Sequence, residues 1–147
     1  MDDDNVRLGI KADLGFSRED RKENLRRISE LSKLFVDAGI IVLAAFISPY
    51  RDDREYIRQR FQEDNFIEVY VKCSLQECER RDPKGHYKKS RAGLIKSYTG
   101  ISSPYEEPER PDLIIDTEQV SIENSASRVV AFLKERNFLF CDEIASF

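Results

Sequence analysis

The segment IIVLAAF, residues 40–46, is a nearly continuous apolar run that directly follows a helical pattern. Over residues 18–38 apolar side chains recur at helical spacing, Ser17 and Asp20 are close to a capping box, and Gly39 supplies the stop. An apolar run rich in branched side chains is typical of a strand that is covered on both faces. The sequence therefore predicts a helix over 18–38 and a buried strand over 40–46.

The same alternation continues toward the C-terminus. We expect a polar-faced helix over 51–61, a strand over 66–72, a helix opened by Ser74 over 74–82, a buried strand over 112–117 and a last helix over about 121–136. Helices that alternate with strands through short connections favour an α/β fold with a parallel sheet flanked by helices. Because ligands bind at the carboxyl ends of such strands, the segments that follow the strands are candidate walls of a site.

Composition limits the classes of function. A length of 147 residues corresponds to one domain, since domains average about 150 residues. The formal net charge of -4 argues against a general binder of nucleic acid or of membrane surfaces, so any anion site must be local. No apolar run approaches the ~20 residues of a membrane span and no leader pattern is visible, so a cytoplasmic location is expected.

Two residue types exclude further chemistry. The three cysteines, Cys73, Cys78 and Cys141, lack the second pair or nearby histidine of a zinc site and are expected to be reduced thiols. His86 is the only histidine, which excludes a Ser-His-Asp set within one chain.

Residues 2–27 combine acidic and basic side chains around a Gly-Phe-Ser turn. The three consecutive aspartates at 2–4 have the chemistry to hold Mg²⁺ or to accept a proton from a hydroxyl. Arg21 and Asn24 share a helix face near its N-terminus, where an anion is favoured. The alternative is a charged terminus followed by a solvated helix face.

A second basic segment, residues 81–93, gathers five basic side chains around Gly85 and Gly93. This composition suits a flap that closes over phosphates, and a basic surface loop is the alternative. Ser48, at the carboxyl end of the first predicted strand, is either a placed hydroxyl or a turn residue. Tyr98 either stacks on a base or packs in the core.

Six strings occur in a fixed order along the chain: DNVR, LGFSREDRKENLRRI, DAGIIVLAAFISPYRDDR, FIEVYVK, CERRDPKGHYKKSRAG and YTGISSPYEEPERPDLIID. Together, over about residues 2 to 139, they resemble the adenylyl-sulfate kinase family, which phosphorylates adenosine 5'-phosphosulfate (APS). The resemblance implies a P-loop kinase fold, a domain over 1–139 and a C-terminal tail over 140–147. It further implies the reaction of ATP, with Mg²⁺, and APS to give ADP and 3'-phospho-APS, and a homodimer.

The resemblance also assigns roles to individual residues. Asp2 and Asp4 are similar to the acidic pair beside Mg²⁺ and the attacking 3'-hydroxyl, Asp2 being the metal ligand, and Ser48 to a phosphoryl-accepting serine. Phe16 and Tyr98 resemble the aromatic pair that sandwiches the adenine of APS. The resemblance implies that seven further residues contact the substrate: Asn5, Arg7, Arg21, Asn24, Ile47, Lys84 and Thr99. The cations expected to close over the nucleotide are Arg81, Lys88, Lys89 and Arg91.

The chain departs from the family pattern at its start. None of its six glycines belongs to a G-x-x-x-x-G-K-[ST] loop, so the first βα unit, which cradles the phosphates of ATP, is absent from this chain. Loss of a central strand is expected to expose apolar faces and unpaired edges. Asp3 stands where the family has glycine and adds a third carboxylate that repels its neighbours.

Two functions follow from this pattern. The first is a kinase whose ATP-binding segment lies outside this sequence. The second is a non-catalytic APS-binding remnant that keeps only the acceptor half of the site. An unrelated small-molecule kinase is disfavoured, because the GFS, FISPY and YTGI strings match the segments that contact APS.

Overall fold

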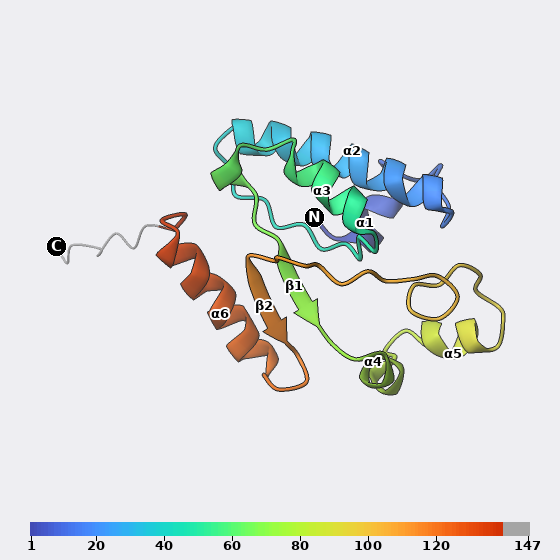
Figure 1. Cartoon of the computed structure of the whole chain (residues 1–147). Helices are drawn as coiled ribbons and strands as arrows, with labels where there is room; N and C mark the ends of the chain where they lie inside the picture. Colours follow the sequence, from blue (N-terminus) through green and yellow to red (C-terminus); the bar gives the residue numbers. More distant parts are fainter. Residues whose placement is uncertain (140–147) are drawn as a thin grey trace.

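The computed structural model describes residues 1–139, so the expected tail at 140–147 and Cys141 lie outside the described residues. Its elements are α1 (Asp3–Arg7), α2 (Arg18–Asp37), α3 (Arg51–Arg58), the 3-10 turn η1 (Glu63–Asn65), β1 (Val69–Lys72), α4 (Leu75–Arg81), α5 (His86–Arg91), β2 (Leu113–Asp116) and α6 (Ile122–Glu135). Helices α2 and α3 form one layer, and the strands with α6 lie below it (Figure 1). Within the described part, no helix is long and apolar enough to cross a membrane.

Strands β1 and β2 pair in parallel, with Val69 opposite Leu113 and Lys72 opposite Asp116. Helix α6 follows β2 and packs along it (Figure 1). This arrangement confirms a mixed α/β fold with a parallel sheet, although the sheet is smaller than the sequence predicts. Ile115 is 2% exposed whereas the adjacent Ile114 is 47% exposed. Since neighbouring side chains of a strand point to opposite faces, the predicted buried strand over 112–117 is covered on one face only.

Helix α2 forms as the sequence predicts. The Ser17 hydroxyl accepts from the Asp20 N–H at 3.0 Å and the Asp20 carboxylate accepts from the Ser17 N–H, which completes a capping box. Leu25 and Ile28 are buried in the small core. Helix α3 packs against α2, where the buried Asp53 pairs with Arg18 at the start of α2.

The predicted strand over 40–46 is wrong. This segment is extended, but its ladder is reduced to one isolated bridge between Asp2 and Ala45, whose N–H donates to the Met1 carbonyl at 2.8 Å. Ile40 is 50% and Leu43 is 68% exposed. A strand needs a hydrogen-bonding neighbour along its length, and the described residues supply one only at Met1 and Asp2.

Other boundaries differ from the prediction by a few residues. The second strand begins at Val69 rather than at 66, and helix α3 ends at Arg58 rather than at 61. Ser74 and Ser121 cap α4 and α6 through the N–H groups of Glu77 and Asn124. The helices predicted over 74–82 and 121–136 are therefore confirmed, each within one residue at either end.

Asp112 ties the start of β2 to α3. Its Oδ2 atom accepts from the Glu68 N–H and from the Arg58 guanidinium, both at 2.8 Å. Burial acts to raise the pKa of Asp112, but the Glu68 N–H and Arg58 outweigh it and hold the pKa below its ordinary value. The carboxylate therefore stabilises the fold above the pKa of the unfolded chain, about 4, and this contribution is lost as pH falls through the lower folded-state pKa.

Replacing Asp112 by asparagine should therefore flatten the pH dependence of the free energy of unfolding between about pH 5 and pH 2. Urea titrations at a series of pH values measure this dependence. The exposed Asp52→Asn is a matched control that should leave the profile of the wild type unchanged. An Asp112→Asn profile that overlays the wild type would contradict the assigned role.

Candidate functional site

The acidic segment at the N-terminus forms the short helix α1. Asp2 caps it by accepting from the Asp4 N–H at 3.2 Å. Asp3 forms an ion pair with Lys11, whose side chain is 1% exposed, and also accepts from the Asn24 amide at 3.4 Å. Asn24 thus contacts the acidic segment from helix α2, and its own Oδ1 is buried with no hydrogen-bond partner in the described part of the chain.

Arg21 joins two distant segments. Its Nε donates to the Phe16 carbonyl at 3.1 Å, and its Nη2 donates to the Ser97 carbonyl at 2.8 Å. Its guanidinium lies 6.0 Å from the centre of the half-exposed Phe16 ring. The arginine therefore brings the Gly-Phe-Ser turn to the residue that precedes Tyr98.

Tyr98 belongs to an aromatic group that no pattern in the sequence indicates. Tyr87 forms a T-shaped pair with it at 5.1 Å between ring centres, and the ring centre of His86 lies at 6.5 Å. Burial raises the pKa of Tyr98. The next residue, Thr99, has a buried hydroxyl without a partner among the described residues.

The backbone fixes the position of Tyr98. Its carbonyl accepts from the N–H groups of Ile101, Ser102 and Ser103, and its N–H donates to the Ser102 hydroxyl at 2.9 Å. Ser102 therefore stabilises this turn through its side chain.

The basic segment at 81–93 contains a helix, α5, and not only a loop. Asp82 caps it by accepting from the N–H groups of Tyr87 at 3.1 Å and Lys88 at 3.0 Å. Lys84 forms an exposed ion pair with Asp4, and this carboxylate raises the pKa of the Lys84 ammonium. The segment thus meets the acidic segment through Lys84.

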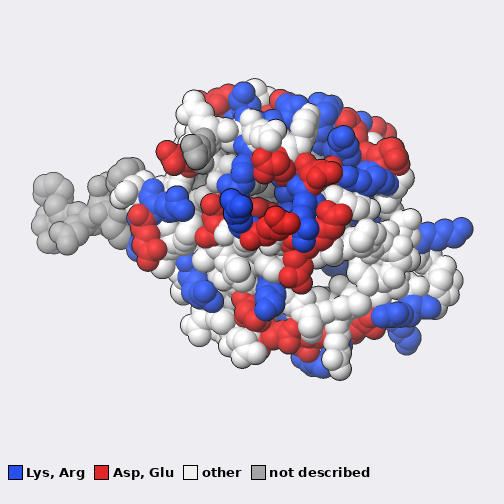
Figure 2. All heavy atoms as spheres, viewed as in Figure 1, with Lys and Arg blue, Asp and Glu red and all other residues white. Residues whose placement is uncertain are grey.

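The other predicted cations of this segment are not brought to the acidic segment. Arg81 pairs with Glu77 and donates to the Thr117 carbonyl at 2.8 Å. Arg91 pairs with Glu79 on α4. Lys88 and Lys89 are exposed on α5. The intermixed basic and acidic atoms on the face shown in Figure 2 agree with such local pairing.

Ser48 lies in a turn after the extended segment 40–46. Its φ of 39° is in the left-handed region, its hydroxyl donates to the Phe46 carbonyl at 3.2 Å, and its carbonyl accepts from Arg54 at 2.6 Å. The neighbouring Ile47 is 57% exposed and therefore accessible to a ligand. Arg54 and Lys11 were missed because no local pattern distinguishes them from surface cations.

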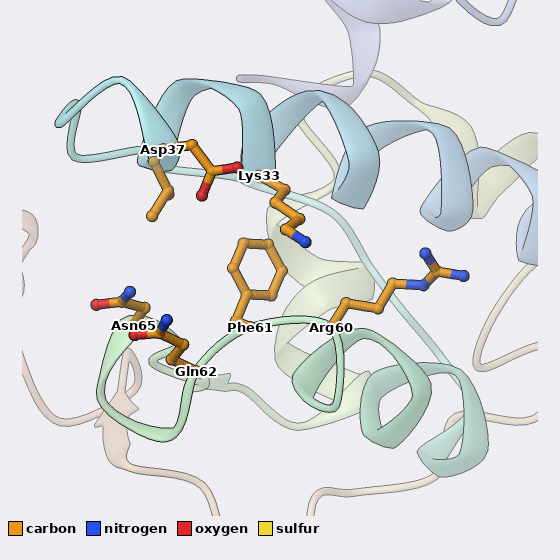
Figure 3. Close-up of a pocket in the computed structure, with 7 residues that line it drawn as sticks. Lys33, Asp37, Arg60, Phe61, Gln62 and Asn65 are labelled. Carbon is orange, nitrogen blue, oxygen red and sulfur yellow. The ribbon is translucent and has the colours of Figure 1, made fainter.

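Two predicted residues gain little support from the structure. Asn5 is exposed on α1. The side chain of Arg7 lies outside the described part of the structure. A separate pocket opens between the end of α2 and the segment after α3, lined by Lys33, Asp37, Arg60, Phe61, Gln62 and Asn65 among others (Figure 3). None of the predicted site residues lines it.

The carboxylate oxygens of the acidic segment are suitable ligands for a cation such as Mg²⁺, which accompanies nucleotides in phosphate-transfer sites. In residues 1–139, no three acidic, cysteine or histidine side chains converge as a metal cage. Mg²⁺ in phosphate-transfer sites is held by one or two carboxylates together with phosphate oxygens. Asp3 and Asp4 are already paired with lysines, so Asp2 is the carboxylate best placed to hold such an ion.

Comparison with known proteins relates the chain to one family. The family model for adenylylsulphate kinase matches residues 1–116. An adenylyl-sulfate kinase of Oceanobacillus iheyensis is 57% identical over 139 residues, which cover 95% of this chain and 70% of the relative. One from Geotalea uraniireducens is 56% identical over 93% of this chain and 66% of the relative. The chain therefore spans about two thirds of the length of such relatives.

Solved structures give the same result. The APS kinase of Mycobacterium tuberculosis in complex with AMPPNP and APS is 46% identical, with a TM-score of 0.84 over 91% of this chain and 78% of that protein. A hexameric APS kinase from Thiobacillus denitrificans is 27% identical, with a TM-score of 0.68 over 95% of this chain and 23% of that protein.

Proposed function

This chain belongs to the adenylylsulphate kinase family, and we propose that it binds APS beside helix α1 and presents the 3'-hydroxyl of APS to the γ-phosphoryl group of ATP. Phosphoryl transfer depends on positioning and on neutralising charge around the transferred group. The Mycobacterium relative, solved with AMPPNP and APS, supports both ligands.

The bridge made by Arg21 is the observation that carries this proposal. It links the Phe16 carbonyl to the Ser97 carbonyl, so that the two aromatic side chains expected to hold adenine belong to segments joined by one guanidinium. Asn24, three residues along the same helix face, reaches the acidic segment. A nucleotide between these segments would meet aromatic faces, a cation and carboxylates.

The acidic segment supplies the reacting end of the proposed site. In the proposal Asp4 orients the 3'-hydroxyl, and Lys84 exchanges its contact with Asp4 for phosphate oxygens when the nucleotides bind. Asp2 would hold the Mg²⁺ that accompanies ATP, and this ion would supply positive charge to the phosphates. The Ser48 turn, Ile47 and Thr99 line the APS side. The exposed Lys88 and Lys89 remain available to phosphates, whereas Arg81 and Arg91 must first leave their glutamate partners.

Self-association and a single domain over 1–139 are also part of the proposal. Large apolar side chains are exposed on several elements, among them Leu34 on α2, Leu43 in the extended segment and Val71 on β1, each more than 60% exposed. Such surface is expected to be covered by other polypeptide. The hexameric Thiobacillus relative supports an assembly, and we propose a homodimer.

Tyr98 provides a test of the adenine site. Tyr98→Ala should weaken APS binding by about 5- to 150-fold, because stacking on a base contributes ~1–3 kcal/mol. Tyr98→Phe keeps the ring and should keep the affinity of the wild type. Calorimetric titration with APS measures both. Equal affinities for Tyr98→Ala and the wild type would place adenine elsewhere.

A product assay separates the kinase from the APS-binding alternative. The sequence holds no G-x-x-x-x-G-K-[ST] loop, and APS binding without phosphoryl transfer is the alternative for the 147 residues by themselves. Incubation with Mg²⁺, ATP and APS, followed by chromatography for 3'-phospho-APS, gives the answer. Product formation supports the kinase, and saturable APS binding without product supports the APS-binding module.

A further inference from the structure

We propose that Arg54 is a positioning residue that holds the two walls of the APS site in register, an inference that rests on the proposed function. Arg54 comes from helix α3, and its side chain is only 10% exposed. Its Nη1 donates to the Ser48 carbonyl and its Nη2 to the Glu106 carbonyl, both at 2.6 Å. Its Nε lies 2.9 Å from Glu68 Oε1.

Two of these contacts are hydrogen bonds from the guanidinium to carbonyl oxygens, and the third is an ion pair with Glu68. The planar group presents its donors in fixed directions, and here the two Nη atoms reach the Ser48 turn and the segment after the Tyr98 turn. A lysine ammonium is a single point charge and is unable to hold both carbonyls in this geometry. The two carbonyls therefore select arginine at this position.

The contacts of Arg54 connect parts of the chain that the proposed site needs together. The Glu106 N–H donates to the Pro49 carbonyl at 2.8 Å, directly beside the Ser48 turn. Only two residues separate Glu106 from Ser103, whose N–H donates to the Tyr98 carbonyl. Movement at Arg54 is thereby transmitted both to the Ser48 turn, which already has a positive φ, and to the turn that carries Tyr98.

Helix α3 provides a matched comparison on the same face. Arg58 lies one turn further along and pairs with Glu68 and Asp112, but neither partner belongs to the proposed APS site. Arg51 contacts the Glu107 carbonyl at the exposed end of the helix. Arg58 therefore shares the structural role of Arg54 and lacks its connection to Ser48.

The test compares Arg54→Lys with Arg58→Lys in the full chain. Arg54→Lys should weaken APS binding by about tenfold, the effect of losing a hydrogen bond to a charged group. Arg58→Lys should change the APS dissociation constant less than about twofold, even if its unfolding midpoint falls as far as that of Arg54→Lys. Hydrogen exchange of the Glu106 N–H should be faster than in the wild type in Arg54→Lys and unchanged in Arg58→Lys.

A second variant leaves the arginine in place. Glu106→Pro removes the N–H that donates to the Pro49 carbonyl, so it should also weaken APS binding. If Arg54→Lys does not fold, this variant tests whether the link between the two turns affects APS affinity. Equal APS affinities for the wild type and the folded variants would overturn the positioning role alone. A wild type that binds no APS would overturn the proposed function and this role with it.

Discussion

Replacing Arg21 by alanine should weaken APS binding by about 1.5 to 3 kcal/mol, the range for hydrogen bonds made by a charged group. The expected loss has two sources. The guanidinium is one of the groups to which the resemblance assigns a contact with the substrate. In the structure it also holds the Phe16 carbonyl and the Ser97 carbonyl together, so its removal separates the two walls of the proposed adenine site.

Arg26→Ala is the control for this measurement. Arg26 lies on the same helix, and it pairs with Glu23 at 2.7 Å on an exposed face. Both variants remove one positive charge, so a nonspecific electrostatic effect would be similar in the two. Calorimetric titrations with APS should show a large loss for Arg21→Ala and none for Arg26→Ala. Equal losses would mean that Arg21 acts only through net charge.

Asp3→Asn should lower the free energy of unfolding by about 3 kcal/mol, because it leaves the charge of Lys11 buried without its partner. The Lys11 side chain is 1% exposed, and Asp3 is its ion-pair partner. The Lys11 ammonium also lies 5.2 Å from the centre of the Phe46 ring, which offers only weak compensation. Urea unfolding measures the loss.

Two further variants make this prediction specific. The double variant Asp3→Asn with Lys11→Met should recover part of the lost stability, since removing both charges avoids an unpaired buried ion. Asp4→Asn breaks the exposed Lys84 pair and should change stability far less. An Asp3→Asn protein as stable as the wild type would show that the buried Lys11 has another partner in solution.

The sequence predicts best where the causes are local. Helix α2 is an example, because its capping box and its apolar spacing act within one helix. The segment 40–46 shows the limit. Its apolar character indicates burial and an extended backbone, but a strand also depends on neighbours at distant positions, and the described residues supply only Met1 and Asp2.

The candidate site shows the same contrast between what local sequence indicates and what depends on distant residues. Residue types and their order indicated Phe16, Arg21, Asn24 and Tyr98, but not that Arg21 reaches Ser97, 76 residues away. The expected repulsion among three adjacent aspartates is also resolved by distant partners. Lys11 pairs with Asp3 and Lys84 pairs with Asp4, which leaves Asp2 to cap the helix.

The central claim, that the acceptor half of an APS kinase site resides in this chain, is tested most directly by titrating APS into the 147-residue protein. AMP, which lacks the sulfate, serves as the reference ligand in a parallel calorimetric titration. We predict saturable heat with one APS per chain and weaker binding of AMP, because AMP lacks the sulfonate oxygens that Arg21 and the neighbouring cations are proposed to contact. Absence of saturable heat with APS would contradict the claim.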